Sequence, residues 1–333
     1  MTRDPLRLAP ELRRRLWGGD ALPDRLGVPP PAGDEPVAEA WLAYGGSRIA
    51  GGPHDGRTLA EVIAAAPTDV VGRASLTRYG PIMPLLAKYL DAAQDLSVQV
   101  HPDDAYALRR HAGSGHLGKT ESWRVLAAHP GAAVAWGFVR PVDEDEVRAA
   151  IRDGSVDRLL RSVPVAPGDV IHNPAGTVHA IGAGALIYEL QQASDLTYRM
   201  WDHGRIGADG RPRELHLDDA LAVADLSGAG QPRVDAHGGP DGWTTRVACP
   251  FYALEEAGGV DAPIDVEGDT GGALHLLTLA SGRAWLEPVD GPAHRIAANE
   301  TWALPAALGG YRVHGRGLLL RGRAVDRGSG STA

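Results

Sequence analysis

The sequence predicts a mainly β protein made of two barrels, with helices added in the N-terminal half. After Pro167 the chain reads PGDVIHNPAGTVHAIGAGALIYELQQ, a series of short apolar runs broken by Gly and Pro. The same texture returns at Thr245 and continues almost to the end of the chain. Short strands with closely spaced turn signals are typical of sandwiches and barrels. Because residues 226–242 have the composition of a linker, we expect an N-terminal domain over 1–225 and a C-terminal domain over 243–325.

Composition and charge exclude several classes of function. The 333 residues are enough for two domains of ordinary size. A formal net charge of −9 leaves no basic footprint for nucleic acid. The single cysteine, Cys249, excludes an internal disulfide and a thiolate cluster for zinc. No apolar run has transmembrane length and no signal peptide is evident, so we expect a cytoplasmic protein with neither a nucleic acid nor a membrane as partner.

The first half of the chain mixes predicted helices with predicted strands. Apolar residues at helical spacing, such as Leu59, Val62 and Ile63, are the main signal for the helices. Helices are expected near Glu11 and over residues 57–66, 83–92, 103–111, 143–153, 156–163 and 217–224. Strands are expected over residues 122–128 and 133–139, and again as short pieces after residue 167.

The last third of the chain has the pattern of short strands alone. They are expected in the segments ALHLLTLA, GRAWLEPV, HRIAANETWALP, YRVHG and GLLLRG. Turn residues separate these segments, which is typical of an all-β module. This region supplies the second predicted barrel.

The stretch LSVQVHPDDA contains the first candidate metal ligands. Its apolar and polar residues alternate, which predicts a strand with one set of side chains on each face. Gln99 and His101 are two residues apart and therefore point to the same face. An amide and an imidazole side by side can begin a metal site, but further ligands are needed to complete it.

Two later motifs supply the missing ligands. GDVIHNPAGTVH has the spacing G-x5-P-x-G-x2-H, in which Pro174 and Gly176 predict a tight turn and the next strand carries His179 inward. This spacing resembles the second signature motif of the cupin jelly rolls, whose histidine binds a metal. In GKTESW, Glu121 stands at the head of a strand with Lys119 on the same face.

Taken in order, these motifs resemble the type I phosphomannose isomerases in their short bacterial form, a family of the cupin superfamily. MPLLAKYLDA, LSVQVHPDDAYA, GKTESW, PAGTVHAIGAG and LIYELQQASDLTYRMWDHGR carry the resemblance. It implies two cupin (jelly-roll) barrels, a catalytic one followed by a metal-free one. It further implies one zinc ion per chain, held by Gln99, His101, Glu121 and His179. The implied reaction interconverts mannose 6-phosphate and fructose 6-phosphate through a cis-enediol.

The resemblance also implies roles around the metal. Arg199, Lys119 and Glu189 are the expected catalytic residues, and a sugar phosphate is the expected small-molecule partner. The base is Glu189 or Lys119, since a lysine near a metal can have a depressed pKa. Arginine binds phosphate through two hydrogen bonds, which suits Arg199. Candidate substrate-binding residues are Ser97, Lys88 and Arg205.

Several alternatives remain open at this level. The same fold could serve another sugar phosphate or a free sugar, or a non-catalytic sugar-binding protein, because fold does not fix function. Nitrogen and oxygen ligands also suit manganese or cobalt. In the second module Gly310 falls where a metal histidine is expected, so we expect no metal there. The chain is expected to be a monomer or a homodimer.

Overall fold

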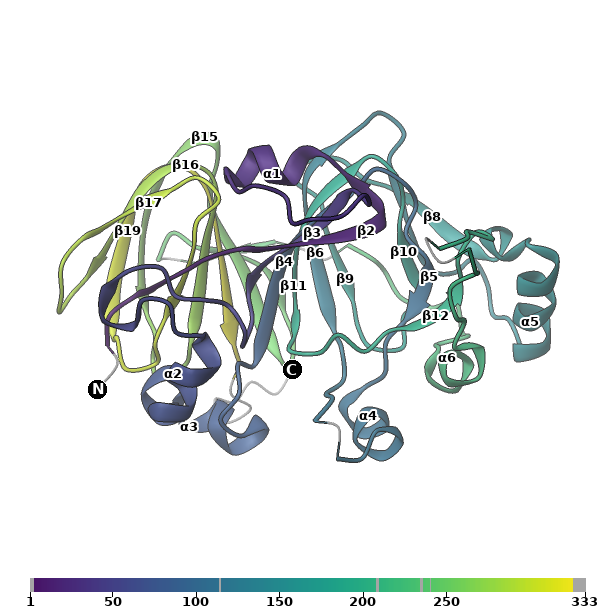
Figure 1. Cartoon of the computed structure of the whole chain (residues 1–333), viewed down its shortest axis with the longest axis horizontal. Helices are drawn as coiled ribbons and strands as arrows, with labels where there is room; N and C mark the ends of the chain where they lie inside the picture. The colour runs from purple at the N-terminus through teal and green to yellow at the C-terminus, as the bar shows by residue number, and fades with distance from the viewer. Residues whose placement is uncertain (1–2, 114, 208–209, 234–235, 240, 326–333) are drawn as a thin grey trace. The chain divides into compact units, whose positions relative to one another are not determined.

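The computed structural model describes residues 3–113, 115–207, 210–233, 236–239 and 241–325 (Figure 1). Its strands form three sheets of eight, six and five strands, so the predicted mainly β fold class is confirmed. The closure of these sheets into two barrels stays a prediction. Within the described ranges, no helix is both long and apolar enough to cross a membrane.

The chain divides into two compact units, and each is built from separate pieces of sequence. We call the first the C-terminal unit; it joins Met1–Glu11 and Trp41–Lys88 to Asp235–Ala333. The second, the site unit, joins Leu12–Ala40 to Tyr89–Val234. The predicted domain boundaries, 1–225 and 243–325, stay a prediction beside this division.

Two sheets carry most of the site unit. The strands of the six-stranded sheet, in spatial order, are β2 (Glu11–Gly19), β3 (Val37–Ala43), β4 (Leu85–Ala92), β11 (Ala185–Gln192), β6 (Glu121–Ala128) and β9 (Val170–Asn173). Those of the five-stranded sheet are β12 (Tyr198–Trp201), β5 (Val98–Val100), β10 (His179–Ile181), β7 (Ala133–Phe138) and β8 (Leu160–Pro164).

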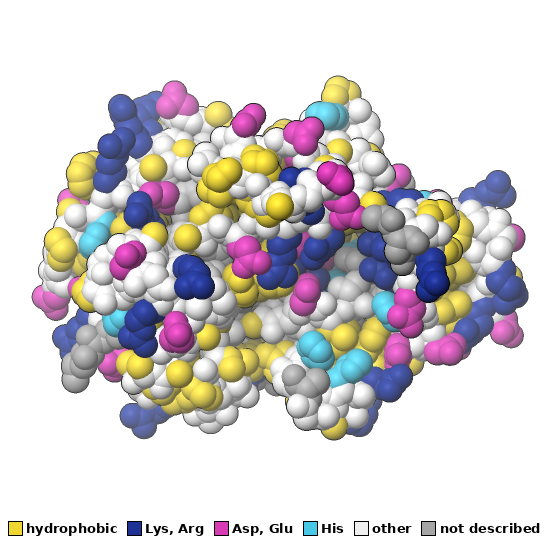
Figure 2. Space-filling model, viewed as in Figure 1, with side chains coloured by type: hydrophobic (Ala, Val, Ile, Leu, Met, Phe, Trp, Pro, Cys, Tyr) yellow, Lys and Arg dark blue, Asp and Glu magenta, His cyan; other side chains and the backbone are white. Residues whose placement is uncertain are grey.

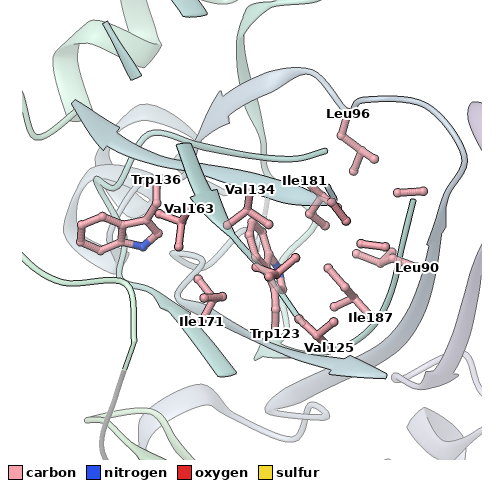
Figure 3. Packing of buried hydrophobic residues seen from close by; sticks show 14 of the residues in the cluster. Leu90, Leu96, Trp123, Val125, Val134, Trp136, Val163, Ile171, Ile181 and Ile187 are labelled. Atoms are coloured by element: carbon pink, nitrogen blue, oxygen red, sulfur yellow. The ribbon is translucent and has the colours of Figure 1, made fainter. Parts of the chain in front are cut away.

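The core of the site unit draws its side chains from both of these sheets (Figure 3). Trp123, Val125 and Ile187 come from the six-stranded sheet, and Val134 and Ile181 from the five-stranded one. All five side chains are almost completely buried. Burying a side chain of this size contributes about 1.5–3 kcal/mol. This packing holds the two sheets against each other. It therefore also fixes the positions of the strand ends that carry the predicted ligands.

One eight-stranded sheet forms the β part of the C-terminal unit. Its strands are β1 (Leu6–Leu8), β18 (Thr301–Leu304), β16 (His275–Pro288), β19 (Gly310–Ala324), β15 (Tyr252–Asp269), β14 (Thr244–Ala248) and β13 (His237–Gly238), with β17 (His294–Ala297) paired to β16. The strands β16 and β19 are longer than the short pieces expected from the sequence. Gly282 and Gly317 were expected to begin new strands, yet the backbones approach so closely there that a Cβ on Gly317 would lie 1.9 Å from a carbonyl oxygen. The two glycines are paired with each other inside continuous strands, and the register shift of β16 lies just before them, between Leu279 and Ser281.

Most helices connect strands along the sequence. They are α1 (Ala21–Leu26), α2 (Leu59–Ala65), α3 (Pro67–Tyr79), α4 (Asp104–Arg110), α5 (Glu144–Asp153) and α6 (Leu217–Val223), with 3-10 turns at Gly52–His54 and Val156–Arg158. Their starts follow capping chemistry, because Thr58, Asp103 and Asp143 each accept a hydrogen bond from a backbone N–H three residues on. The predicted helices over 57–66, 103–111, 143–153 and 217–224 therefore correspond to α2, α4, α5 and α6.

Three expected helices are wrong. Residues 83–92 contain the strand β4, which is buried at nearly every position and so lacks the alternation that marks a half-exposed strand. The segment near Glu11 is the strand β2, whose backbone pairs with its neighbours despite its run of arginines. Residues 156–163 begin with a 3-10 turn and continue as β8, paired with β7. In each case pairing within a sheet overrides local propensity.

Candidate metal centre

Two neighbouring strands of the five-stranded sheet bring three of the predicted ligands together. His179, the first residue of β10, lies directly opposite Gln99 on β5. His101 follows β5 two residues after Gln99, so the two side chains share a face. The predicted turn before His179 is present, with the Thr177 N–H donating to the Pro174 carbonyl at 3.0 Å. In that turn the Gly176 N–H donates to the His101 carbonyl at 2.9 Å, which ties the two ligand segments together.

The fourth predicted ligand comes from the other sheet. Glu121 is the first residue of β6 and lies opposite Gln191 on β11. Lys119 precedes it by two residues, and its N–H donates to the Pro102 carbonyl at 3.0 Å. Gly118 immediately precedes Lys119 in the sequence. It lies so close to the start of α4 that a Cβ on this residue would be 2.4 Å from the Asp104 nitrogen. A glycine there lets Lys119 and Glu121 reach the histidines.

His101, Glu121 and His179 form a compact group of possible metal ligands. Their ligand atoms all lie within 4.8 Å of one another. His101 Nε2 lies 3.3 Å from Glu121 Oε2, and His179 Nε2 lies 3.2 Å from Glu121 Oε1. The three residues are almost completely buried. A carboxylate and two imidazoles are a donor set that zinc and similar divalent ions accept.

Hydrogen bonds on the far side of each ring fix which nitrogen faces the group. His101 Nδ1 donates to the Leu196 carbonyl at 3.0 Å, and His179 Nδ1 donates to the Thr177 carbonyl at 2.8 Å. A carbonyl oxygen can only accept, so the proton of each neutral ring sits on Nδ1. Each Nε2 therefore presents a lone pair to Glu121. Metal-binding histidines are oriented in this way by backbone carbonyls.

The atoms that face one another in this group show whether a cation would fit between them. The two Nε2 lone pairs face the two carboxylate oxygens, and all four atoms are hydrogen-bond acceptors. Glu121 Oε2 has the Lys119 ammonium 2.9 Å away, but Glu121 Oε1 has no hydrogen-bond donor among the described residues. Buried acceptors without donors are costly, and a divalent cation between them removes that cost. The donor set of this chain therefore fits a metal ion.

Gln99 completes the group from the side. Its amide nitrogen lies 3.3 Å from His179 Nε2. Oxygen and nitrogen of a terminal amide are exchanged by a half-turn, and that half-turn would present Oε1 to a cation. The amide is therefore positioned to be a fourth ligand.

The charges around the group shift two pKa values. Burial, helped by the Lys119 ammonium, lowers the pKa of His101 to about 3, which keeps its ring neutral. Burial also opposes the charged form of Lys119, but the carboxylates of Glu121 and Glu189 outweigh it and raise the pKa of this lysine. Lys119 Nζ lies 2.9 Å from Glu121 Oε2 and 3.2 Å from His101 Nε2. The protein's own groups thus shift the Lys119 pKa in the direction opposite to the depression considered from the sequence.

Glu189 lies deep in the same unit. It is opposite Trp123 in the register of β11 and β6, and it accepts a hydrogen bond from the indole N–H of Trp123 at 2.9 Å. Its side chain is only 3% exposed. Ile187, two residues earlier on β11, packs in the same core cluster as Trp123 and Val125. Sequence reasoning did not identify Trp123 as the partner of Glu189, since only the strand register joins them.

Arg199 is the third member of a row across the five-stranded sheet. It lies opposite Gln99, which in turn lies opposite His179. Its Nη1 donates to the Glu214 carbonyl at 2.8 Å, while its buried Nε has no partner in the described part of the chain. Burial, together with the charges of Arg213 and Arg205, lowers the pKa of Arg199. An arginine with a spare buried donor is suited to binding an anion.

Arg205 and Arg213 both bind the buried carboxylate of Asp202. Arg205 also donates to the Asp95 carbonyl at 2.6 Å, and Arg213 Nε donates to Asp202 Oδ2 at 2.7 Å. Arg205, a predicted substrate residue, is thus engaged by the protein itself. Arg213 was not identified from the sequence, because nothing in its loop segment marks it as a neighbour of Arg199.

The other two predicted substrate residues are buried. Ser97 is 5% exposed and lies just before β5, on the same face as Gln99. Lys88 is 4% exposed and lies on β4, with its Nζ 4.9 Å from the centre of the Trp41 ring. Lys88 belongs to the C-terminal unit, whereas the other predicted site residues belong to the site unit.

Comparisons with known proteins agree on one family. A family model described as the phosphomannose isomerase type I catalytic domain matches residues 6–119. The mannose-6-phosphate isomerase ManA of Bacillus subtilis is 38% identical over 258 residues, which cover 76% of this chain and 79% of that protein. The mannose-6-phosphate isomerase of Streptococcus mutans is 39% identical over 224 residues, 66% of this chain and 67% of that protein. A crystal structure of the mannose 6-phosphate isomerase from Bacillus subtilis matches with a TM-score of 0.83 and 30% identity, covering 96% of this chain and 99% of that one.

Proposed function

Because the chain belongs to the type I phosphomannose isomerase family, we propose that it interconverts mannose 6-phosphate and fructose 6-phosphate. The observation that carries the proposal is the convergence of His101, Glu121 and His179, whose ligand atoms lie within 4.8 Å of one another in a chain of this family. The proposed reaction moves a proton between carbon 2 and carbon 1 of the sugar through a cis-enediol. A family of sugar-phosphate isomerases supports a small sugar phosphate as the substrate class.

We propose that the metal is zinc, one ion per chain, held by Gln99, His101, Glu121 and His179. This ion suits the available ligands, which are one carboxylate, one amide and two imidazoles whose Nε2 atoms are held toward Glu121. When bound, a divalent ion supplies positive charge that stabilises negative charge developing on the sugar oxygens. The same ligands suit manganese or cobalt, so a metal analysis is part of the test.

Lys119 and Glu189 are the proposed groups for proton transfer. Lys119 Nζ lies 2.9 Å from Glu121 Oε2, so its ammonium is held beside the metal group. As an ammonium it can donate a proton or stabilise an oxyanion, but it must lose its proton before it acts as a base. Glu189 is a buried carboxylate fixed by the Trp123 indole, and a carboxylate accepts a proton directly. This favours Glu189 as the base and Lys119 as the acid.

Arg199 is the proposed residue for the negative charge of the substrate. Its backbone is registered beside Gln99, and its Nε is buried with no partner in the described residues. Arg213 and Arg205 add positive charge around it, since they share the single carboxylate of Asp202. Ser97 and Lys88 remain proposed substrate residues. The cytoplasmic location and the monomeric or dimeric state stay predictions.

The proposal is tested by a coupled assay for fructose 6-phosphate formed from mannose 6-phosphate. Purified protein is measured as isolated, after chelation, and after zinc, manganese or cobalt is restored. We expect chelation to remove activity and zinc to restore it. A folded, metal-loaded protein without activity on mannose 6-phosphate would reject the substrate, and a panel of other sugar phosphates and free sugars would follow. Inactivity on the whole panel would favour a non-catalytic sugar-binding protein.

A further inference from the structure

The C-terminal unit has an open groove on the outer face of its sheet, within residues 264–316. Its volume is about 680 Å³. Four arginines line it, namely Arg283, Arg295, Arg312 and Arg316, together with Trp285, His314, Asp265 and Glu287. Dark blue side chains gather over the ends of β16 and β17 in Figure 2. Four arginines against two carboxylates make the groove basic, in a chain whose net charge is −9.

The strand register explains why these side chains face outward together. Arg295, Trp285, His314 and Asp265 lie opposite one another across β17, β16, β19 and β15. The residues between them in sequence, such as Ala284, Leu286 and Val313, point the other way into the core. The outer row is therefore fixed by the same alternation that builds the core.

Two of the four arginines form no ion pair with the described residues. Arg312 is paired with Asp265 at 2.8 Å, and Arg316 with Asp261 at 3.3 Å. In the described part of the chain, Arg283 and Arg295 have no ion pair or hydrogen bond through their side chains. Arg283 also lies directly opposite Arg316, and like charges in that position repel. An anion between the strands would relieve this repulsion.

Trp285 adds a flat apolar surface between the two unpaired arginines. It lies opposite Arg295 and two residues after Arg283. Its side chain is 46% exposed, although tryptophan is usually well buried. An exposed indole is a platform on which a planar ring can stack, and a guanidinium beside it can bind phosphate through two hydrogen bonds.

We propose that this groove binds a nucleotide, with the base stacked on Trp285 and the phosphates held by Arg283 and Arg295. A nucleotide combines a planar ring with a chain of negative charge, which are the two features the groove offers side by side. Four strands spaced about 4.8 Å apart give it the width for both parts. The site lies wholly in the C-terminal unit and is independent of the proposed isomerase reaction.

The test measures binding of ADP and GDP to the full-length protein by calorimetry at low salt. Adenosine, pyrophosphate and mannose 6-phosphate serve as partial ligands. We expect a nucleoside diphosphate to bind with a Kd below about 1 mM, and adenosine and pyrophosphate to bind at least tenfold more weakly. Pyrophosphate or mannose 6-phosphate binding as tightly at the groove would overturn the proposal in favour of a simple anion patch. Absence of nucleotide binding at several millimolar would overturn it outright.

Variants assign the binding to the groove. The double substitution Arg283→Gln with Arg295→Gln should weaken nucleotide binding at least tenfold, and Trp285→Ala should weaken it about fivefold or more. Arg152→Gln, an exposed arginine of α5 in the site unit, is the matched control and should leave the Kd unchanged. All these side chains are exposed, so near-UV circular dichroism should show an intact fold. An unchanged Kd in the double variant would place any nucleotide binding elsewhere.

Discussion

The two units each bury a carboxylate, but only Glu255 has a donor for both of its oxygens. In the site unit, Glu121 Oε2 has the Lys119 ammonium 2.9 Å away, while Glu121 Oε1 faces the lone pair of His179 Nε2 and has no donor among the described residues. In the C-terminal unit, Glu255 accepts a hydrogen bond from Arg321 Nε at 2.7 Å, and Arg323 lies 3.2 Å away. An unmet buried acceptor beside two imidazole lone pairs suits a bound cation, whereas a carboxylate with donors for both oxygens suits a structural role.

The surroundings of Arg321 strengthen this contrast. The guanidinium lies 3.9 Å from the centre of the Trp243 ring, and its Nη1 donates to the Tyr311 hydroxyl at 3.2 Å. Tyr311 in turn lies 2.9 Å from His275 Nδ1. A guanidinium with its own carboxylate and aromatic partners therefore occupies the polar interior of this unit. Among the described residues, one group of His and acidic side chains is close enough together to hold a metal ion, and it lies in the site unit.

Histidine substitutions in the two units should have the largest difference in effect. His179→Ala removes a lone pair that faces Glu121, so we expect loss of the metal and a fall in kcat beyond the about 10–100-fold typical of residues that only support a ligand. His275→Ala removes a partner of Tyr311 and should leave kcat nearly unchanged in folded protein. The coupled assay measures both. Equal losses in the two variants would break the contrast.

The two lysines of the chain, Lys119 and Lys88, give the next comparison. Lys119→Met removes the ammonium beside Glu121, and we expect kcat to fall by about 10²–10⁴-fold, as for a proton-transfer group. Lys88→Met removes a charge held over Trp41 and should raise KM more than it lowers kcat. Steady-state kinetics separate the two effects. A normal kcat in Lys119→Met would exclude this lysine from the reaction.

Breaking the arginine network should affect stability without affecting the metal. Arg321→Ala leaves Glu255 buried without its main partner, and loss of one member of such a pair costs about 3–5 kcal/mol. Urea unfolding measures this cost, with Arg152→Ala as an exposed control expected to stay within about 0.5 kcal/mol. The metal content of the folded variant should be unchanged. A change below 1 kcal/mol would mean that the network contributes little.

The smallest expected effect is the pH dependence of this pair. Burial raises the pKa of Glu255, but Arg321 and Arg323 outweigh it and hold the pKa below its ordinary value. A depressed folded pKa contributes stability that is present above the unfolded pKa and is lost as the pH falls through the folded pKa. Wild type should therefore lose more stability than Glu255→Gln between pH 6 and pH 3.5. Parallel urea-unfolding curves in the two proteins would contradict this.

The candidate metal ligands could be located in the sequence because their motifs are short and local. Gln99 and His101 share one strand, and Pro174 and Gly176 shape the turn that leads to His179. The contacts that orient these residues could not be predicted. The histidine rings donate to the backbone carbonyls of Leu196 and Thr177, and every residue type has such a carbonyl. Arg213 was missed for a similar reason, because only the fold brings its loop to Asp202.

The fold was predicted in class but not in every element. Strands with turn signals indicated a mainly β chain, and the helical spacing of Leu59, Val62 and Ile63 located α2. The strand β4 was mistaken for a helix because it is buried on both faces and shows no period of two. Gly282 and Gly317 were expected to begin separate strands, whereas they allow close approach of two long strands.

The metal content of carboxylate variants tests the central contrast most directly. Wild type, Glu121→Gln and Glu255→Gln are purified in parallel, and metal per chain is measured by mass spectrometry together with isomerase activity. We predict about one equivalent and full activity in wild type and in Glu255→Gln, and almost no metal or activity in Glu121→Gln. A folded Glu121→Gln protein that keeps both its metal and its activity would contradict the assignment of the site.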